Sequence, residues 1–155
     1  MSLASEEIMV ATELSLSSFL QQHAEWLENP NNGRRADLSG LTFNEQQAVK
    51  ANLRKVLAVG ATFLDAHLNE SDLSESRLTR ADFQRADLTG ADLTKADVTD
   101  ANFSGAWMAG ANLSEINAKE TNFRRVKWKG ARLMDASMHV VRCDECSAEG
   151  ASFHQ

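Results

Sequence analysis

The sequence feature that most constrains how this chain can fold is a repeat with a period of five residues, which runs without a gap from residue 61 to residue 155. Typical pentads read ADFQR, ADLTG, ADLTK and ANFSG. With the large apolar residue at the centre named i, position i−2 is small and usually alanine, i−1 is often Asp or Asn, and i+1 and i+2 are mostly polar. A period of five fits neither an amphipathic helix, which repeats about every 3.6 residues, nor a strand, which alternates every two. The period therefore predicts a repeat architecture in which each pentad is a very short extended segment followed by a corner.

Glycine falls at one place in the pentad. All eight glycines of the chain except Gly33 lie at i+2. Because glycine adopts positive φ without steric cost, as a tight turn requires, this slot is expected to form the corner. Positions i and i−2 then point inward, and the other three positions face water.

A second period is visible in the phenylalanines at pentad centres, which recur every 20 residues at Phe43, Phe63, Phe83, Phe103 and Phe123. Twenty residues are four pentads, so we expect four-sided coils with the Phe rings stacked on one side as a structural core ladder. In a neighbouring column bulky Trp128 is followed one coil later by Ala148, as expected if large and small side chains compensate in a close-packed interior.

These pentads resemble the pentapeptide-repeat family, whose consensus is A(D/N)LXX. The resemblance covers residues 61–155 strongly and residues 36–60 more weakly, and it implies an all-β solenoid, a right-handed quadrilateral β-helix. The motif is highly specific for the fold and says almost nothing about function.

The chain is predicted to comprise two segments. The first is an N-terminal segment over residues 1–35. Its stretch SLSSFLQQHAEWLE predicts an amphipathic α-helix over about residues 16–28, which ends before Pro30 and is followed by a turn. We expect this helix to cap the open end of the solenoid, where it would hide unpaired backbone and apolar interior. His23 is expected to be a packed core histidine.

The second segment is the repeat domain over residues 36–155. Residues 61–155 form its regular part. Residues 36–60 keep the same phase and are read as a degenerate first coil. The alternative for residues 45–59 is a helix with four apolar residues on one face.

No catalytic or nucleotide-binding motif is found, and the four histidines are scattered. A filled prism with flat sides offers no concave site with converging groups. We therefore expect a protein that is not an enzyme, without catalytic residues, cofactor or metal.

The two cysteines, Cys143 and Cys146, form a C-x-x-C motif. The first is a pentad centre and the second the next i−2 position, so both are expected to point inward and pack in the core; zinc held with His139 or His154 is the alternative. Two cysteines without a framework spacing favour a reducing compartment, most simply the cytoplasm. The acidic N-terminus is a poor signal peptide, and no apolar stretch is long enough to span a bilayer.

Three outward-facing features are candidates for recognition. Aspartates at i−1 form a collar on four successive sides of one coil, and a band of basic residues lies nearer the C-terminus. Trp107 occupies an i−1 slot that is otherwise mostly polar, where it either lies on Lys127 as a cation–π pair or is exposed as an anchor for a partner. The charged residues either form a solvated surface with pairs between coils, such as Asp72 or Asp92 near Arg132, or an electrostatic recognition surface. The candidate interaction surface comprises Trp107, Asp82, Asp87, Asp92, Asp97, Arg124, Lys127 and Arg132.

These features favour a protein-interaction scaffold with an unidentified protein partner, and neither direct nucleic-acid nor membrane binding is expected. The alternative, implied by the resemblance, is a DNA mimic that binds and protects DNA gyrase or topoisomerase IV, both type II topoisomerases. The net charge of −6 and the Asp collar favour it, whereas the basic band interrupts any continuous negative side. A stabilising or targeting module for a larger assembly is a third class. We also expect self-association, as a homodimer formed end to end through the C-terminal coil.

Overall fold

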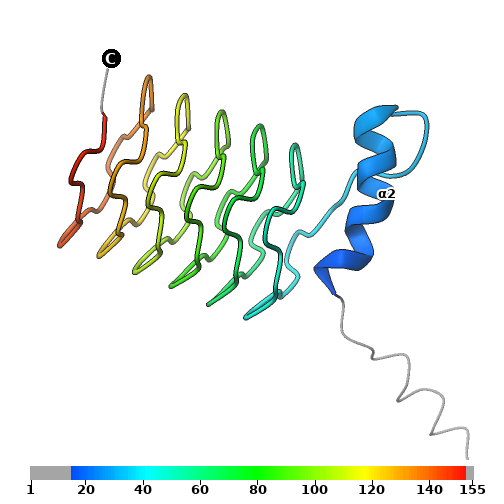
Figure 1. Cartoon of the computed structure of the whole chain (residues 1–155), viewed down its shortest axis with the longest axis horizontal. Helices are drawn as coiled ribbons and strands as arrows, with labels where there is room; N and C mark the ends of the chain where they lie inside the picture. The colour runs from blue at the N-terminus through cyan, green and yellow to red at the C-terminus, as the bar shows by residue number, and fades with distance from the viewer. Residues whose placement is uncertain (1–14, 153–155) are drawn as a thin grey trace, which may run out of the picture.

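A computed structural model describes residues 15–152 of the protein. The chain begins with one helix, α2 (Leu16–Glu28), and then winds into a rod of stacked coils (Figure 1). The helix lies against one end of the rod, and the coil that contains residue 152 forms the opposite end. The predicted all-β quadrilateral solenoid with an α-helical cap is confirmed.

Successive coils pair through single parallel β-bridges between residues 20 apart, from Asp37 with Leu57 to Arg132 with Ser152. Every bridging residue is at i−1. Residues 45–59 take part in the same pattern, so they wind as a coil and not as a helix. The backbone N–H of Phe83 donates to Asn102 of the next coil at 2.7 Å, and that of Asp82 donates to Ala61 of the preceding coil at 2.9 Å. This exchange repeats along the rod and satisfies the backbone of segments too short to form regular strands.

Each corner is a four-residue turn that begins at i. The N–H of the next i−2 residue donates to the carbonyl of i, for example Ala86 to Phe83 at 3.1 Å. Every described i+2 residue from Gly40 to Gly150 has positive φ, and where it is not glycine it is Asp, Glu, Lys, Arg or, once, Val140. Non-glycine residues adopt this conformation at a cost of about 1–2 kcal/mol each, which the surrounding backbone ladder must offset. The glycines therefore mark the corner correctly but occupy only some of the corners.

The interior is filled by the i and i−2 side chains, and its most regular part is the Phe ladder. The rings of Phe43, Phe63, Phe83, Phe103 and Phe123 stack with centroid separations of 5.5, 4.9, 4.9 and 5.3 Å. These separations match the spacing of about 4.8 Å between hydrogen-bonded strands, so the backbone register sets the ring spacing. Phe19 of α2 meets the first ring, Phe43, edge to face at 6.0 Å and so joins the cap to the ladder.

A buried histidine helps to fix helix α2 to the first coil. His23 is fully buried, its Nδ1 accepts the backbone N–H of Ala36 at 3.1 Å, and its Nε2 lies 2.9 Å from the carbonyl oxygen of Arg54. Because Nδ1 accepts, Nε2 carries the proton and donates to that carbonyl. Burial lowers the pKa of His23, which keeps the ring in this neutral form. The loop that follows packs so closely that a Cβ at Gly33 would lie 2.2 Å from the carbonyl oxygen of Gln22.

The opposite end of the rod is open within the described part of the chain. Cys143 and Ala148 are exposed, whereas Phe123 and Trp128, their counterparts one coil earlier, are buried. No helix within residues 15–152 has the length and apolarity needed to cross a bilayer.

Candidate interaction surface

The aspartates of the collar support turns. Each accepts the backbone N–H of the residue two positions later at 2.8–3.1 Å, as Asp92 does from Thr94 at 2.8 Å. The side chains of Asn102, Asn112 and Asn122 accept in the same way at 3.1–3.2 Å. Asp and Asn therefore recur at i−1 because their side-chain oxygen stabilises the turn that follows. The collar is explained by the repeat itself and does not require a partner.

Charged residues at i+1 and i+2 form ion pairs between neighbouring coils. Asp65 accepts two hydrogen bonds from Arg85, at 2.8 and 2.7 Å, and these bonds hold the pKa of Asp65 below its usual value. Similar pairs join Lys50 with Glu70, Arg54 and Lys55 with Glu75, Lys95 with Glu115, Arg124 with Asp144, Arg125 with Glu145, and Lys129 with Glu149. Exposed pairs of this kind contribute little individually, but they join Arg124, Arg125 and Lys129 of the predicted basic band to carboxylates one coil further on. The predicted pairs of Arg132 with Asp72 or Asp92 are not among the ion pairs of residues 15–152.

Trp107 is a large aromatic side chain on the outside of the rod, where it is 49% exposed. Its backbone forms β-bridges with Asp87 of the preceding coil and with Lys127 of the next coil. The ammonium nitrogen of Lys127 lies 3.4 Å from the centroid of the indole ring, so a cation–π contact covers one face of the ring. The ring therefore contacts Lys127 and is still half-exposed, whereas its role as an anchor for a partner stays a prediction.

A shallow surface hollow of about 390 Å³ adjoins the indole of Trp107. His67 and Asp87 line it from the same face of the rod, and Asp65 and Arg85 line it from the neighbouring corner. Thr89 completes the lining. The hollow thus combines an aromatic side chain with an imidazole, the carboxylate of Asp87 and the Asp65–Arg85 charge pair. We name Trp107, His67, Asp87, Arg85 and Asp65 the tryptophan face.

The structure brings together only some of the predicted surface residues. Trp107, Asp87 and Lys127 share one row, whereas Asp82, Asp92 and Asp97 lie in the three other rows of bridges. Arg132 belongs to the row of Asp92, and Arg124 pairs with Asp144. Asp65, His67 and Arg85 were not predicted as site residues. The sequence signal that could have found them is the spacing of 20 residues. It places His67 in one column with Asp87 and Trp107, and Asp65 one coil before Arg85.

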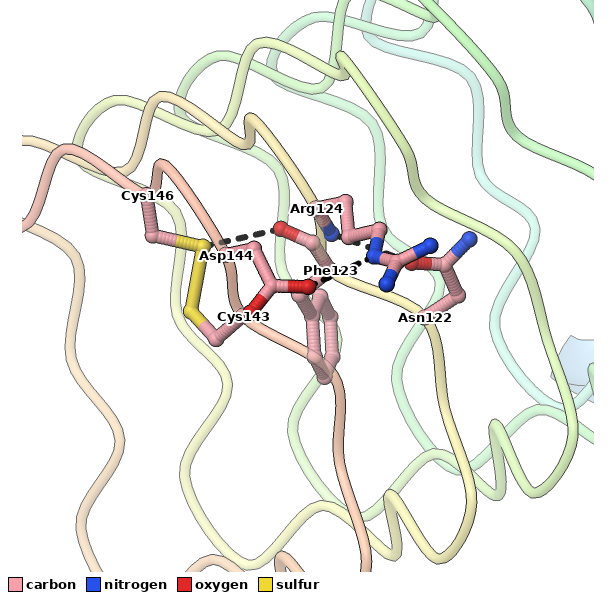
Figure 2. Close-up of a disulfide and its surroundings, with 6 residues drawn as sticks. All are labelled: Asn122, Phe123, Arg124, Cys143, Asp144 and Cys146. Atoms are coloured by element: carbon pink, nitrogen blue, oxygen red, sulfur yellow. Dashed lines mark hydrogen bonds and ion pairs between the residues drawn. A yellow bond between two sulfur atoms is a disulfide. The ribbon is translucent and has the colours of Figure 1, made fainter.

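The prediction that both cysteines pack in the core is wrong for Cys143. Cys143 and Cys146 are joined by a disulfide, with their Cα atoms 5.5 Å apart (Figure 2), and Cys143 is exposed. The physical reason is its position in the last described coil, where no further coil within residues 15–152 covers it. Both sulfurs are bonded to each other and do not ligate zinc in this state; His154 of that alternative lies outside the described residues. The inference of a reducing compartment, which rested on two cysteines without a framework spacing, also loses its basis.

The profile of pentapeptide repeats matches the chain in eight copies, over residues 49–85, 66–105, 76–114 and 96–133. Among solved structures, the chain is similar to HetL of the cyanobacterium Nostoc sp. strain PCC 7120, a pentapeptide repeat protein involved in heterocyst differentiation regulation. The identity is 25% and the TM-score 0.61, over 76% of this chain and 62% of HetL.

Two further solved structures are less similar. Rfr23 of the cyanobacterium Cyanothece 51142, also a pentapeptide repeat protein, shares 16% identity with a TM-score of 0.49, over 84% of this chain and 97% of Rfr23. QnrB1, a plasmid-mediated fluoroquinolone resistance protein, shares 13% identity with a TM-score of 0.22, over 77% of this chain and 90% of QnrB1. A search of curated proteins gave no significant match.

Proposed function

The chain belongs to the pentapeptide-repeat family, and from this premise we propose that it is a non-catalytic protein-interaction scaffold whose partner binds at the tryptophan face. The rod holds its surface side chains in fixed rows, because each i−1 residue is tied by backbone hydrogen bonds to the coils before and after it. A scaffold of this kind presents a rigid surface and loses little conformational entropy on binding.

The observation that carries the proposal is the exposure of Trp107. An indole is the side chain that most often dominates the free energy of a protein interface, since it buries a large apolar area and keeps a hydrogen-bond donor. Lys127 fixes the ring from one side, which leaves its remaining surface and the adjoining hollow for a partner. The carboxylate of Asp87 favours a partner that presents a basic or hydrogen-donating group beside its apolar contact.

A binding role also agrees with the interior of the rod. Within residues 15–152 the inward positions are filled by buried side chains, mostly Phe, Leu, Val and Ala. The surface hollow beside Arg124 is lined mainly by charged residues that already pair with one another, Arg124 with Asp144 and Arg125 with Glu145.

The likeness to HetL supports a regulatory binding role. HetL is a pentapeptide repeat protein involved in heterocyst differentiation regulation. The chain spans 62% of the length of HetL, and we propose only that it shares a regulatory mode of action, without assigning it to the same process.

The alternative of a DNA mimic for a type II topoisomerase is less well supported. A mimic of duplex DNA needs a continuous negative side, because the duplex carries dense phosphate charge. Asp65, Glu70, Glu75 and Glu115 are instead paired with cations of the neighbouring coil. A supercoiling assay with purified DNA gyrase separates the two functions, since inhibition or protection at micromolar protein would favour the mimic.

The test of the proposed function is partner capture with Trp107→Ala beside wild type. Val49→Ala is the matched control, because Val49 is 45% exposed on the same side of the rod and is not part of the tryptophan face. We expect proteins retained by wild type and Val49→Ala to be lost with Trp107→Ala, with a purified partner binding about 30-fold more weakly. Equal retention by all three proteins, with unchanged circular dichroism, would show that Trp107 is not the anchor.

A further inference from the structure

The disulfide corner carries an inference that is independent of the tryptophan face. We propose that Cys143 and Cys146 form a reversible thiol–disulfide exchange site, which reacts with dithiols and which the coil accommodates in both the oxidised and the reduced state.

The turn brings the two sulfurs together whether or not they are bonded. Cys143 is at i and Cys146 at the next i−2, which are the first and last residues of the four-residue turn found at every corner. Glu145 between them has φ of 59°, like the i+2 residues of the other corners. The Cα–Cα distance of 5.5 Å lies within the range that a disulfide requires. The repeat thus sets the separation, and the bond can form without a change of backbone.

Two arginines of the preceding coil tether the residues between the cysteines. Nε of Arg124 lies 2.7 Å from Oδ2 of Asp144, and Nε of Arg125 lies 3.0 Å from Oε2 of Glu145. Figure 2 shows the first of these contacts directly beside the disulfide. The tethers fix the corner from outside, so its shape does not depend on the sulfur–sulfur bond.

The reduced state has a place in the structure as well. Elsewhere in the rod, hydroxyl side chains at i−2 donate to the carbonyl of the residue 23 positions earlier: Ser76 to Leu53 and Thr121 to Val98, both at 2.8 Å. The sulfur of Cys146 lies 2.9 Å from the carbonyl oxygen of Phe123, in the same relation (Figure 2). A disulfide sulfur has no proton to donate, whereas a thiol has one. Reduction therefore converts this contact into a hydrogen bond that the repeat already uses at two other corners.

The exposure of the two residues sets the order of the reaction. Cys143 is exposed and Cys146 is partly buried, so an incoming thiolate attacks Sγ of Cys143. The sulfur–sulfur bond breaks, a mixed disulfide forms at Cys143, and Cys146 leaves as a thiolate that takes a proton from water. The second thiol of the reductant then attacks the mixed disulfide and releases Cys143 as a thiol and the reductant as its own disulfide. Two electrons and two protons reach the protein, and the reverse reaction returns them.

The experiment equilibrates the full chain with graded ratios of reduced to oxidised dithiothreitol, blocks free thiols with iodoacetamide and counts the blocked thiols by mass spectrometry. We expect one reversible transition between two free thiols and none, with an unchanged far-ultraviolet circular dichroism spectrum. Thiols that stay free at every ratio would overturn the proposal, and so would reduction that occurs only together with loss of the spectrum.

Single variants test the order of attack. With oxidised glutathione, Cys146→Ser keeps the exposed thiol and should form a mixed disulfide about tenfold faster than Cys143→Ser, which keeps the partly buried one. Serine at position 146 occupies a slot that Ser76 fills elsewhere, so this variant is expected to fold. Equal rates for the two variants would contradict the assignment of Cys143 as the attacked sulfur.

Discussion

The residue that best shows how this sequence works is the aspartate at i−1. Its abundance suggests charge, yet Asp92 accepts both the backbone N–H and the hydroxyl of Thr94, at 2.8 and 2.5 Å. One coil further on, the uncharged Asn112 makes the same two contacts with Ser114. The oxygen acceptor is what the turn needs, and the negative charge is secondary.

The roles of acceptor and charge are separated by two substitutions at position 92. Asp92→Asn keeps an oxygen acceptor and should change the free energy of unfolding by less than about 0.5 kcal/mol, whereas Asp92→Ala should lower it by about 1 kcal/mol because the N–H of Thr94 loses its partner. Urea unfolding measures both. If asparagine proved as destabilising as alanine, the charge of the collar would be its important property.

Helix α2 is an element whose attachment depends on the protonation of one side chain. Nδ1 of His23 accepts the N–H of Ala36, and protonation of this nitrogen would remove the acceptor and bury a charge beside Arg35, whose own charge also lowers the pKa of His23. Trp26 stacks on the imidazole with ring centroids 5.7 Å apart, and its uncharged indole cannot neutralise a protonated His23. The cap is therefore expected to respond to acid before the rest of the rod.

The pH dependence has a definite sign. Since burial lowers the pKa of His23 below its ordinary value of 6.5, the unfolded chain binds the proton more readily than the folded chain. Its contribution to stability is complete above pH 6.5 and is lost as the pH falls through the lower folded pKa. When the pH is lowered from 7.5 to 5.5, hydrogen exchange should show a larger loss of protection for residues 16–36 than for residues 80–120. His23→Gln should lose this difference between the two pH values; an unchanged difference would assign the effect to another group.

At the scale of the whole molecule, the two ends of the described rod differ. One end is covered by α2, whereas at the other the N–H groups of Met138, Cys143 and Ala148 meet no further coil within residues 15–152, although their counterparts in preceding coils donate to the next coil. Such an edge favours pairing with another edge. We propose that the protein self-associates through this edge of the described rod.

The proposal of self-association predicts a dimer in sedimentation velocity at micromolar concentration. Ala148→Glu places a charge on the exposed end of the rod and should shift the protein to monomer without changing its circular dichroism, because Ala148 is exposed. Val49→Glu, at an exposed position far from this coil, serves as the control. A wild-type protein that sediments as a monomer would contradict the proposal.

Much of the fold could be predicted from spacing alone, because an interior column tolerates few side chains. The five Phe residues at intervals of 20 specify both the number of sides and their register. The tryptophan face could be predicted only in part, since the spacing places Asp87, Trp107 and Lys127 in one row but does not say how the ring and the ammonium meet. Side chains at i+1 and i+2 choose among several neighbours, so the pairing of Arg124 with Asp144 was not predictable. The disulfide was not predicted, because the pentad pattern places every residue at i in the interior. This holds only where coils lie on both sides, and the described part of the chain has no further coil beyond Cys143.

The register of 20 residues between bridged positions sets how such a rod can change its length. Adding a complete coil of 20 residues extends the rod and keeps the residues of each side in their rows. Adding a single pentad between Trp107 and Lys127 instead turns all that follows by a quarter, and the ammonium then faces a different direction from the indole. Surfaces of this protein that rely on alignment between coils can therefore be lengthened by four pentads at a time, whereas inserting any other number of pentads places their residues on different sides of the rod.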